Sequence, residues 1–353
     1  MKLKELQEFL RTEKLDAALF VTYEYKDDAA LRYLAQTPVD TGALIVPDSG
    51  QPELLIPGFE YDRIKRIAPV KTVCASRWFE TIVKRLGHAK DIGINGDIFA
   101  VSEQRVFKHM KRGIRFIDIS DSIAELRVRK TPAELKLTAE SCTIACEIMD
   151  DCINKLGRFK TEQDVARFLI QKTVAADCEL AFPPIVASGP NAATPHHLPA
   201  SKLHPGFCVI DFGVRWNGYC SDMTRTAFMG KPTRKEQEAY ELLLHVQTHA
   251  LDKLLPDVDY GLISRQAQRE LGPWGRYFIH RLGHSVGLWV HDVVPRSMWE
   301  RIVLDEGMVW TVEPGIYVPK KFGMRIEDTA VVTDDGHRVL TEKTPKELAV
   351  IPF

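Results

Sequence analysis

The stretch from Asp211 to Asp222 constrains this chain most, because it predicts a tight hairpin that carries a carboxylate on each strand. Its Asn217-Gly218 pair is the strongest short hairpin signal in the sequence and is typical of a type I′ turn. With these two residues as the loop, the strand register follows from the turn. That register places Asp211 opposite Thr224.

Both aspartates are expected on one face of this hairpin. Side chains alternate between the two faces of a strand, so Asp211 and Gly213 point the same way and Asp222 faces with them. The aspartates are then diagonal neighbours, roughly 7–8 Å apart at Cα. Burying either charge without a partner would cost several kcal/mol. The pattern therefore indicates either a cation between the carboxylates or a solvent-exposed strand edge at which both carboxylates are hydrated.

Length and composition favour a globular protein of two domains. The 353 residues exceed what one compact core usually holds. The contents of 45% hydrophobic and 27% charged residues are ordinary for a soluble protein, and the net charge of −1 gives no indication of nucleic acid or an anionic membrane as a partner. The N-terminal residues 1–11 are charged and helically periodic, and no apolar run is long enough to span a bilayer. We expect neither a signal peptide nor a membrane segment.

The cysteines favour a reducing compartment. There are seven, an odd number, and no C-x-x-C motif occurs. Cys142 and Cys146 share a helix face by their spacing, but such a pair more often packs than takes part in redox chemistry. We therefore expect reduced thiols and a cytoplasmic location.

The first part of the chain, residues 1–124, predicts an α/β domain. Strands that alternate with helices indicate an open sheet, mostly parallel or mixed. This part contains no phosphate loop, no glycine-rich fingerprint and no cluster of ligands. We expect a non-catalytic domain that gates the substrate or contacts a second subunit. Helices are predicted near 2–13, 59–67, 77–86 and 101–112, and strands near 17–21, 42–47, 53–57, 69–73, 91–95 and 114–117.

Residues 125–353 are predicted to repeat one unit of two helices and a hairpin. Helices are expected at 132–154 and 161–175 before the first hairpin, and at 233–254 and 260–271 before a second hairpin between Glu306 and Val332. This period of about a hundred residues indicates a duplication about a pseudo-twofold axis. The alternative is a coincidence between two strand-rich segments.

The duplication strengthens the case for a metal, because the second hairpin supplies Glu313 and Glu327 at places equivalent to the two aspartates. Four converging carboxylates repel one another by roughly 4 kcal/mol per close pair at intermediate dielectric. Only protons or multivalent cations make such a cluster tolerable. His284 adds an imidazole. The set suits two cations with bridging carboxylates, and its oxygen ligands favour manganese, cobalt or iron as readily as zinc.

Four motifs resemble the pita-bread metallopeptidases, and among these the proline-specific branch of Xaa-Pro dipeptidase (prolidase) and aminopeptidase P. They read D-F-G-x-x-x-x-G-Y-x-S-D-M-T-R-T, H-R-L-G-H-S-V-G-L-x-V-H-D, T-V-E-P-G-I-Y and M-R-I-E-D-T, and they occur in this order over the catalytic half. The resemblance implies an α/β N-terminal domain at 1–124, followed by an α+β pita-bread (creatinase/aminopeptidase) catalytic domain at 125–353. It also implies two divalent metal ions, manganese or cobalt first and zinc or iron as alternatives, and a homodimer.

The resemblance also assigns roles to individual residues. It implies that the five metal ligands are Asp211, Asp222, His284, Glu313 and Glu327. Glu313 is expected to carry the proton of the attacking water, and His196 and His291 to contact the substrate as further catalytic residues. Three more residues are expected around the substrate: His280 as a supporting group, Arg296 as a clamp for the substrate's terminal carboxylate, and Arg325 as a counter-charge to the acids. Plain solvated arginines are the alternative for the last two.

The implied function is hydrolysis of the Xaa-Pro bond at the N-terminus of short proline-containing peptides, most simply as an Xaa-Pro dipeptidase. Aminopeptidase P activity on longer peptides is the alternative within the branch. Creatinase-like hydrolases and non-catalytic partner-binding proteins share this scaffold but lack some or all of the five ligands.

Overall fold

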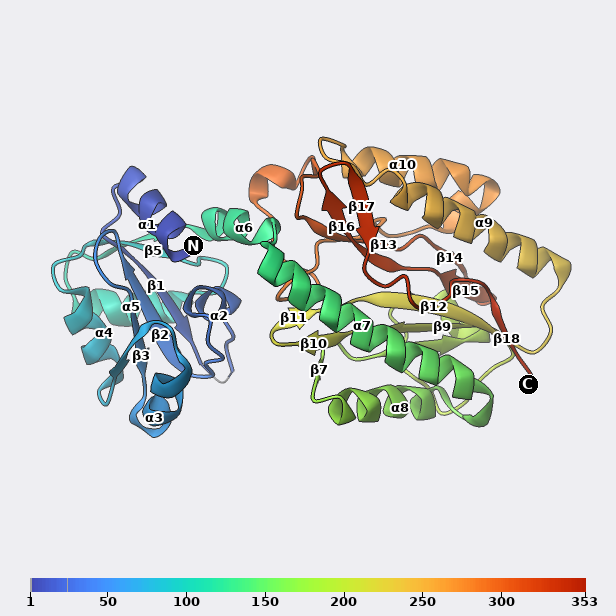
Figure 1. The fold of residues 1–353 in the computed structure, drawn as a ribbon, viewed down its shortest axis with the longest axis horizontal. Helices are drawn as coiled ribbons and strands as arrows, with labels where there is room; N and C mark the ends of the chain where they lie inside the picture. The colour runs from blue at the N-terminus through green and yellow to red at the C-terminus, as the bar shows by residue number, and fades with distance from the viewer. Residues whose placement is uncertain (1, 24) are drawn as a thin grey trace. The chain divides into compact units, whose positions relative to one another are not determined.

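The computed structural model describes residues 2–23 and 25–353 of the chain. It divides into two compact units, Met1–Leu126 and Arg127–Phe353 (Figure 1), and each is described by itself. The division falls inside a helix, α6 (Ser120–Val128), where the sequence indicated only a boundary.

The smaller unit is built on one mixed sheet. Its described elements are α1 (Lys2–Thr12), β1 (Ala17–Thr22), α2 (Ala29–Ala35), β2 (Gly42–Pro47), β3 (Glu53–Ile56), α3 (Gly58–Ile67), β4 (Lys71–Cys74), α4 (Trp78–Leu86), β5 (Asp91–Ile94), α5 (Val101–Met110) and β6 (Arg115–Asp118). The strand order is β4-β3-β2-β1-β5-β6. Strand β2 runs antiparallel to β1 and β3, and the remaining neighbours are parallel. The predicted α/β domain is confirmed.

Helix α2 was not predicted from the sequence, because it is short and its residues show no clear helical periodicity of apolar and polar side chains. It begins at a cap, since the Asp28 carboxylate accepts a hydrogen bond from the Ala30 N–H at 3.0 Å. The same carboxylate accepts a bond from Asn95 Nδ2 at 3.0 Å, which ties the start of α2 to the end of β5. A tertiary contact of this kind leaves no periodic signal in the sequence.

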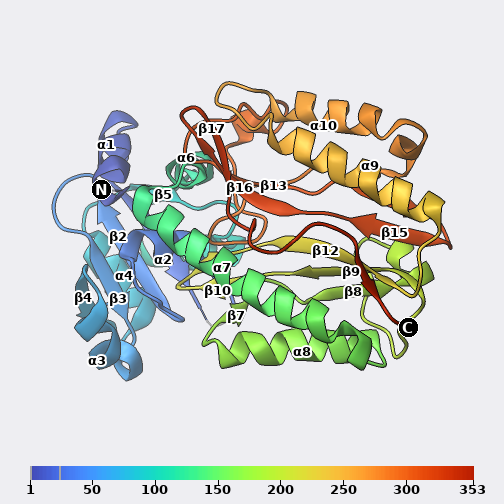
Figure 2. The same cartoon turned by 45° about the vertical axis from the view of Figure 1, so that its right-hand side comes forward.

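The larger unit places two helix pairs outside several short sheets (Figures 1 and 2). Buried side chains of the first helix pair, such as Met149 and Leu169, pack with those of the first hairpin. Side chains of the second pair, such as Leu243 and Ile263, pack with those of the second hairpin. The helices are α7 (Pro132–Lys155), α8 (Glu162–Ala175), α9 (Arg234–Leu251) and α10 (Tyr260–Glu270), with 3-10 turns η1 (Leu156–Arg158), η2 (Gly189–Ala193), η3 (Gly272–Tyr277) and η4 (Arg296–Met298). The strands are β7 (Glu179–Leu180), β8 (Ile185–Ser188), β9 (Gly206–Phe212), β10 (Val214–Trp216), β11 (Tyr219–Cys220), β12 (Met223–Met229), β13 (Val309–Val312), β14 (Gly315–Val318), β15 (Phe322–Arg325), β16 (Asp328–Thr333), β17 (Gly336–Val339) and β18 (Ala349–Ile351).

The first hairpin has the register that its turn predicts. Asn217 and Gly218 both have positive φ, 48° and 87°, as a type I′ turn requires. Asp211 therefore pairs with Thr224. The hairpin is interrupted at Gly213, where a Cβ atom would lie 2.0 Å from the Ser221 carbonyl oxygen. Only glycine permits this close approach of the two strands between the aspartates.

The second hairpin, like the first, consists of antiparallel strands with a break, but its strand register differs. Its turn has three residues, 319–321, and Lys320 at its centre has a φ of 61°. Val312 pairs with Asp328 on one side of a break and Gly315 with Arg325 on the other, so Glu313 lies directly opposite Glu327. In the first hairpin Asp211 faces a threonine instead. The two-residue and three-residue turns thus produce related rather than equivalent pairs of acids.

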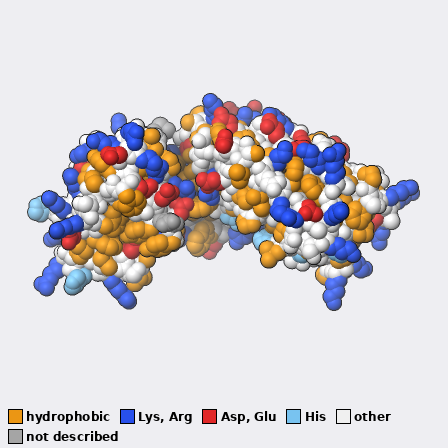
Figure 3. All heavy atoms as spheres, turned by 90° about the horizontal axis from the view of Figure 1, so that it is seen from below, with side chains coloured by type: hydrophobic (Ala, Val, Ile, Leu, Met, Phe, Trp, Pro, Cys, Tyr) orange, Lys and Arg blue, Asp and Glu red, His pale blue; other side chains and the backbone are white. Residues whose placement is uncertain are grey.

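The exterior agrees with the near-neutral net charge of −1. Lys, Arg, Asp and Glu side chains are mixed with hydrophobic ones over the face in Figure 3. Within residues 2–23 and 25–353, no helix is both long enough and apolar enough to cross a membrane.

We expect Gly213→Ala to lower the free energy of unfolding by about 2–3 kcal/mol, because the added methyl group forces the strands apart. Gly218→Ala is the matched control in the same hairpin: it keeps open space around the new atom and meets only the positive φ, which costs about 1 kcal/mol. Urea denaturation of the intact chain followed by tryptophan fluorescence measures both. Equal losses for the two variants would contradict this account of the break.

Candidate metal centre

All four predicted acidic ligands lie where strands of the two hairpins break. Asp211 is near the end of β9 and Asp222 immediately precedes β12, while Glu313 follows β13 and Glu327 immediately precedes β16. The hairpins meet at this level, since the Glu327 N–H donates to the Thr224 carbonyl at 3.1 Å. The strand breaks release the side chains from regular alternation and direct them to one place.

His284 completes the cluster from the loop between η3 and η4. One donor atom each of Asp222, His284 and Glu327 lie within 4.8 Å of one another. His284 Nε2 is 3.4 Å from Asp222 Oδ2 and 3.5 Å from Glu313 Oε1. Its Nδ1 lies 3.2 Å from the Ser285 carbonyl, which can only accept, so Nδ1 carries the proton. In the neutral ring this tautomer directs the Nε2 lone pair at the acids, as a metal-binding imidazole requires.

Asp211 is tied to the cluster by a buried arginine. Arg325 Nη2 donates to Asp211 Oδ2 at 2.6 Å and Arg325 Nε donates to Thr224 Oγ1 at 3.0 Å. The Thr224 hydroxyl donates in turn to Glu327 Oε2 at 2.6 Å. Arg325 is only 3% exposed. Its guanidinium thus supplies one positive charge to a group of four acids and orients two of them.

One positive charge does not neutralise the cluster. Burial raises the pKa of Asp222 well above its usual value, and the nearby Asp211 and Glu313 raise it further. Burial, followed by repulsion from neighbouring carboxylates, likewise raises the pKa values of Glu313 and Glu327. The oxygens Asp211 Oδ1 and Asp222 Oδ1 are buried without a hydrogen-bond partner. Buried carboxylate oxygens that lack donors, in a cluster that also contains an imidazole nitrogen, fit one or more divalent cations.

The three predicted histidines differ in their exposure and in their hydrogen-bond partners. His280 is linked to Arg325 through Tyr317. Arg325 Nη1 donates to Tyr317 OH at 2.6 Å, and Tyr317 OH lies 3.0 Å from His280 Nε2. His280 Nδ1 donates to the Arg281 carbonyl at 2.7 Å, so Nε2 accepts from the tyrosine. Burial lowers the pKa of His280 to about 4, which keeps the ring neutral.

His291 and His196 are exposed, in contrast to His280. The His291 ring stacks on His284 with centroids 3.9 Å apart. His196 lies within electrostatic range of both His280 and His291. The structure therefore places His196 near His280 and His291, and these two rings near His284. Arg296 starts the turn η4, is exposed, and has its guanidinium 5.9 Å from the Trp299 ring.

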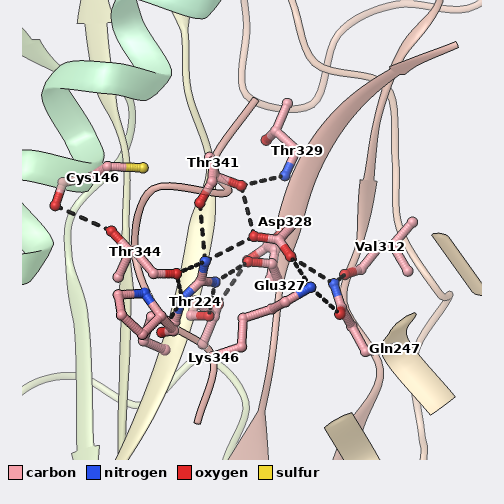
Figure 4. Close-up of polar contacts among 12 residues, drawn as sticks. Cys146, Thr224, Gln247, Val312, Glu327, Asp328, Thr329, Thr341, Thr344 and Lys346 are labelled. Carbon is pink, nitrogen blue, oxygen red and sulfur yellow. Dashed lines mark hydrogen bonds and ion pairs between the residues drawn. The ribbon is translucent and has the colours of Figure 1, made fainter. Parts of the chain in front are cut away.

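A second buried network, which was not predicted from the sequence, lies behind Glu327 (Figure 4). Asp328 accepts from Arg225 Nη2 at 2.8 Å, Gln247 Nε2 at 2.9 Å and Thr341 Oγ1 at 2.8 Å, and Lys346 Nζ lies 3.0 Å away. Burial alone would raise the pKa of Asp328, but these cations hold it below its ordinary value. Arg225 Nη1 also donates to the Glu327 carbonyl at 2.6 Å, so this network fixes the backbone of the cluster.

The sequence carried a signal for some of these supporting residues. Thr224 and Arg225 lie in the motif M-T-R-T, and Tyr317 ends the motif T-V-E-P-G-I-Y. Their positions beside predicted ligands could have marked them. Gln247 and Lys346 come from distant segments and have no local pattern, so only the folded chain places them near Asp328.

Comparison with known proteins agrees with this geometry. Residues 136–334 match metallopeptidase family M24, and residues 2–129 match the creatinase/prolidase N-terminal domain. An Xaa-Pro dipeptidase of Pyrococcus furiosus is 36% identical over 323 residues, which cover 90% of this chain and 91% of the relative. The prolidase structure from Pyrococcus horikoshii has a TM-score of 0.89 at 31% identity and covers 98% of this chain and 99% of that one.

An X-Pro aminopeptidase structure from Thermotoga maritima also has a TM-score of 0.89, at 26% identity, with 97% of this chain and 100% of the other covered. The resemblance to the proline-specific branch of the pita-bread enzymes is thereby confirmed. The chain belongs to metallopeptidase family M24, with a creatinase/prolidase N-terminal domain, and it is a peptidase.

Proposed function

We propose that this enzyme is an Xaa-Pro dipeptidase that uses two divalent cations. The observation that carries the proposal is the convergence of His284 Nε2 with three carboxylates, at 3.4 Å from Asp222, 3.5 Å from Glu313 and within the 4.8 Å group that includes Glu327. Relatives named Xaa-Pro dipeptidase match the chain at 36% and 33% identity over 90% and 98% of its length. The donor set supports a metal-dependent peptidase, and the relatives support its specificity for Xaa-Pro bonds.

Two cations suit the residues better than one. The proposed ligands are Asp211, Asp222, His284, Glu313 and Glu327, and a single tetrahedral ion would leave carboxylate oxygens of this set without a partner. The oxygen-rich donors suit manganese or cobalt, with zinc or iron as alternatives. When bound, such ions supply Lewis-acid activation of a water and of the scissile carbonyl.

Glu313 is the best placed of the acids to move a proton. Its side chain is 16% exposed, against 11% for Asp211 and 6% for Asp222. Burial and the neighbouring Glu327 raise the pKa of Glu313, so it holds a proton readily. The leaving prolyl nitrogen is part of a tertiary amide and has no N–H, so it must receive a proton before it departs. Glu313 would take that proton from the water and deliver it.

The exposed groups around the centre would hold the peptide. His196 and His291 have accessible rings and would donate to the carbonyl oxygen as it gains charge. Arg296 would bind the terminal carboxylate of a dipeptide through its forked guanidinium. His280 and Arg325, predicted as substrate-binding groups, have protein partners at their polar atoms in this structure. They would orient Tyr317 and Asp211.

An aminopeptidase P acting on longer peptides is the second candidate, favoured by the Thermotoga structural neighbour. A creatinase-like hydrolase or a non-catalytic partner-binding protein is not favoured, because all five ligand residues are present. We further propose a homodimer in the cytoplasm, with residues 1–124 gating the substrate or contacting the second subunit. A monomeric mass in solution would contradict the dimer.

Glu313→Gln should abolish turnover of Leu-Pro, at least about a thousandfold, because the amide cannot carry the proton. Substantial metal binding should remain, since the amide oxygen can still coordinate. The exposed Glu306→Gln, an equal change of charge in the same region, should keep full activity. Assays with manganese or cobalt and metal analysis of the purified variants measure both effects. Full activity in Glu313→Gln would refute the proton transfer.

Substrate length distinguishes the two candidate peptidases. Assays of the manganese- or cobalt-loaded enzyme should show cleavage of Leu-Pro and little or none of Ala-Pro-Ala, because the proposed Arg296 clamp binds a carboxylate only one residue beyond the scissile bond. Leu-Ala, which has a secondary amide, serves as the control for proline specificity. A preference for the tripeptide would establish aminopeptidase P instead.

A further inference from the structure

Glu162, the first residue of α8, is a fully buried carboxylate that binds one loop at several points. Its Oε1 accepts hydrogen bonds from the Ser188 N–H and hydroxyl, both at 2.7 Å, and from Asn191 Nδ2 at 3.1 Å. Its Oε2 accepts from the Ala200 N–H at 2.8 Å and lies 3.0 Å from His197 Nε2. Both oxygens of this one residue are thus occupied by the segment 188–200.

The loop supplies the hydrogen-bond donors that keep this carboxylate ionised. Burial alone would raise the pKa of Glu162, but the donors of Ser188, Ala200 and Asn191 lower it below the ordinary value. A buried charge of this kind is tolerated only while its donors are in place. The carboxylate and the ordered conformation of the loop therefore depend on each other.

The segment held in this way carries His196. The residue lies between Asn191 and His197, two of the anchored positions, and its own side chain is exposed and near His280 and His291. The loop also packs tightly at η2, because a Cβ on Gly323 would lie 1.8 Å from the Ala192 carbonyl oxygen. With both ends fixed, the few residues between them have little freedom to move.

We propose that Glu162 is a positioning residue of this peptidase, which holds His196 at the metal centre by binding both ends of the loop 188–200. Its effect on turnover rests on the proposed function, because it acts through the contact of His196 with the substrate. The anchoring of the loop does not rest on that function. His197, whose Nε2 lies 3.0 Å from Glu162 Oε2, serves as one of the anchors.

The kinetic test is Glu162→Gln, which keeps the shape but replaces one acceptor oxygen by a donor facing the Ala200 N–H. We expect a fall of about tenfold in kcat/KM for Leu-Pro, the effect of losing a hydrogen bond to a charged group, with unchanged metal content. His196→Ala should lower activity as well. The double variant should be no worse than His196→Ala alone, since both changes act on one group. Additive losses would overturn the proposal, because they would show that Glu162 acts only on general stability.

A second measurement does not depend on activity. Hydrogen–deuterium exchange of residues 191–200 should be faster in Glu162→Gln than in the native enzyme. Glu236→Gln, which removes a charge from the capping box at the start of α9, should leave this loop unchanged. Should Glu162→Gln fail to fold, His197→Ala removes a single anchor and should give a smaller increase in the same peptides. Unaltered exchange in a folded variant overturns the anchoring, whereas a native enzyme inactive on Leu-Pro with the expected exchange refutes only the proposed function.

Discussion

Repulsion between four clustered and largely buried carboxylates is the constraint on which the larger unit depends. Asp211, Asp222, Glu313 and Glu327 are brought together by strand breaks, and burial with mutual repulsion raises the pKa values of three of them. A protein retains such a cluster only with compensating charge. Arg325 supplies part of it, and the unpartnered oxygens of both aspartates indicate where cations would supply the rest. The surrounding structure can be understood as support for that arrangement.

Support comes from two buried acids that are not ligands. Asp328 contacts Arg225, Gln247 and Lys346 behind Glu327. Glu162 accepts hydrogen bonds from the loop that carries His196. Each acid lies next to the site rather than in it. Each holds a stretch of backbone that carries a site residue, and neither is expected to contact the substrate. The pattern is the same in both cases: a fully buried carboxylate is satisfied by several donors from distant parts of the chain. The rigidity of the centre therefore depends on residues with no direct role in the chemistry.

Local rules explain what could be predicted from the sequence. The Asn217-Gly218 turn fixed the first register, and α7 begins at Pro132, where the sequence predicted a helix start. The convergence of the four acids was expected from hairpin geometry and from the repeat, and the structure groups two of them, Asp222 and Glu327, with His284 within 4.8 Å. The register of the second hairpin was not foreseen, because its three-residue turn around Lys320 has no comparable sequence signal. Glu162 and Asp328 were missed because their partners lie up to about a hundred residues away, where no periodicity connects them.

The most direct measurement is anomalous diffraction from crystals of the enzyme loaded with manganese, collected at the manganese absorption edge. We expect two peaks, both inside the cluster and together ligated by Asp211, Asp222, His284, Glu313 and Glu327. A single peak, or peaks bound by other residues while either glutamate points away, would contradict it.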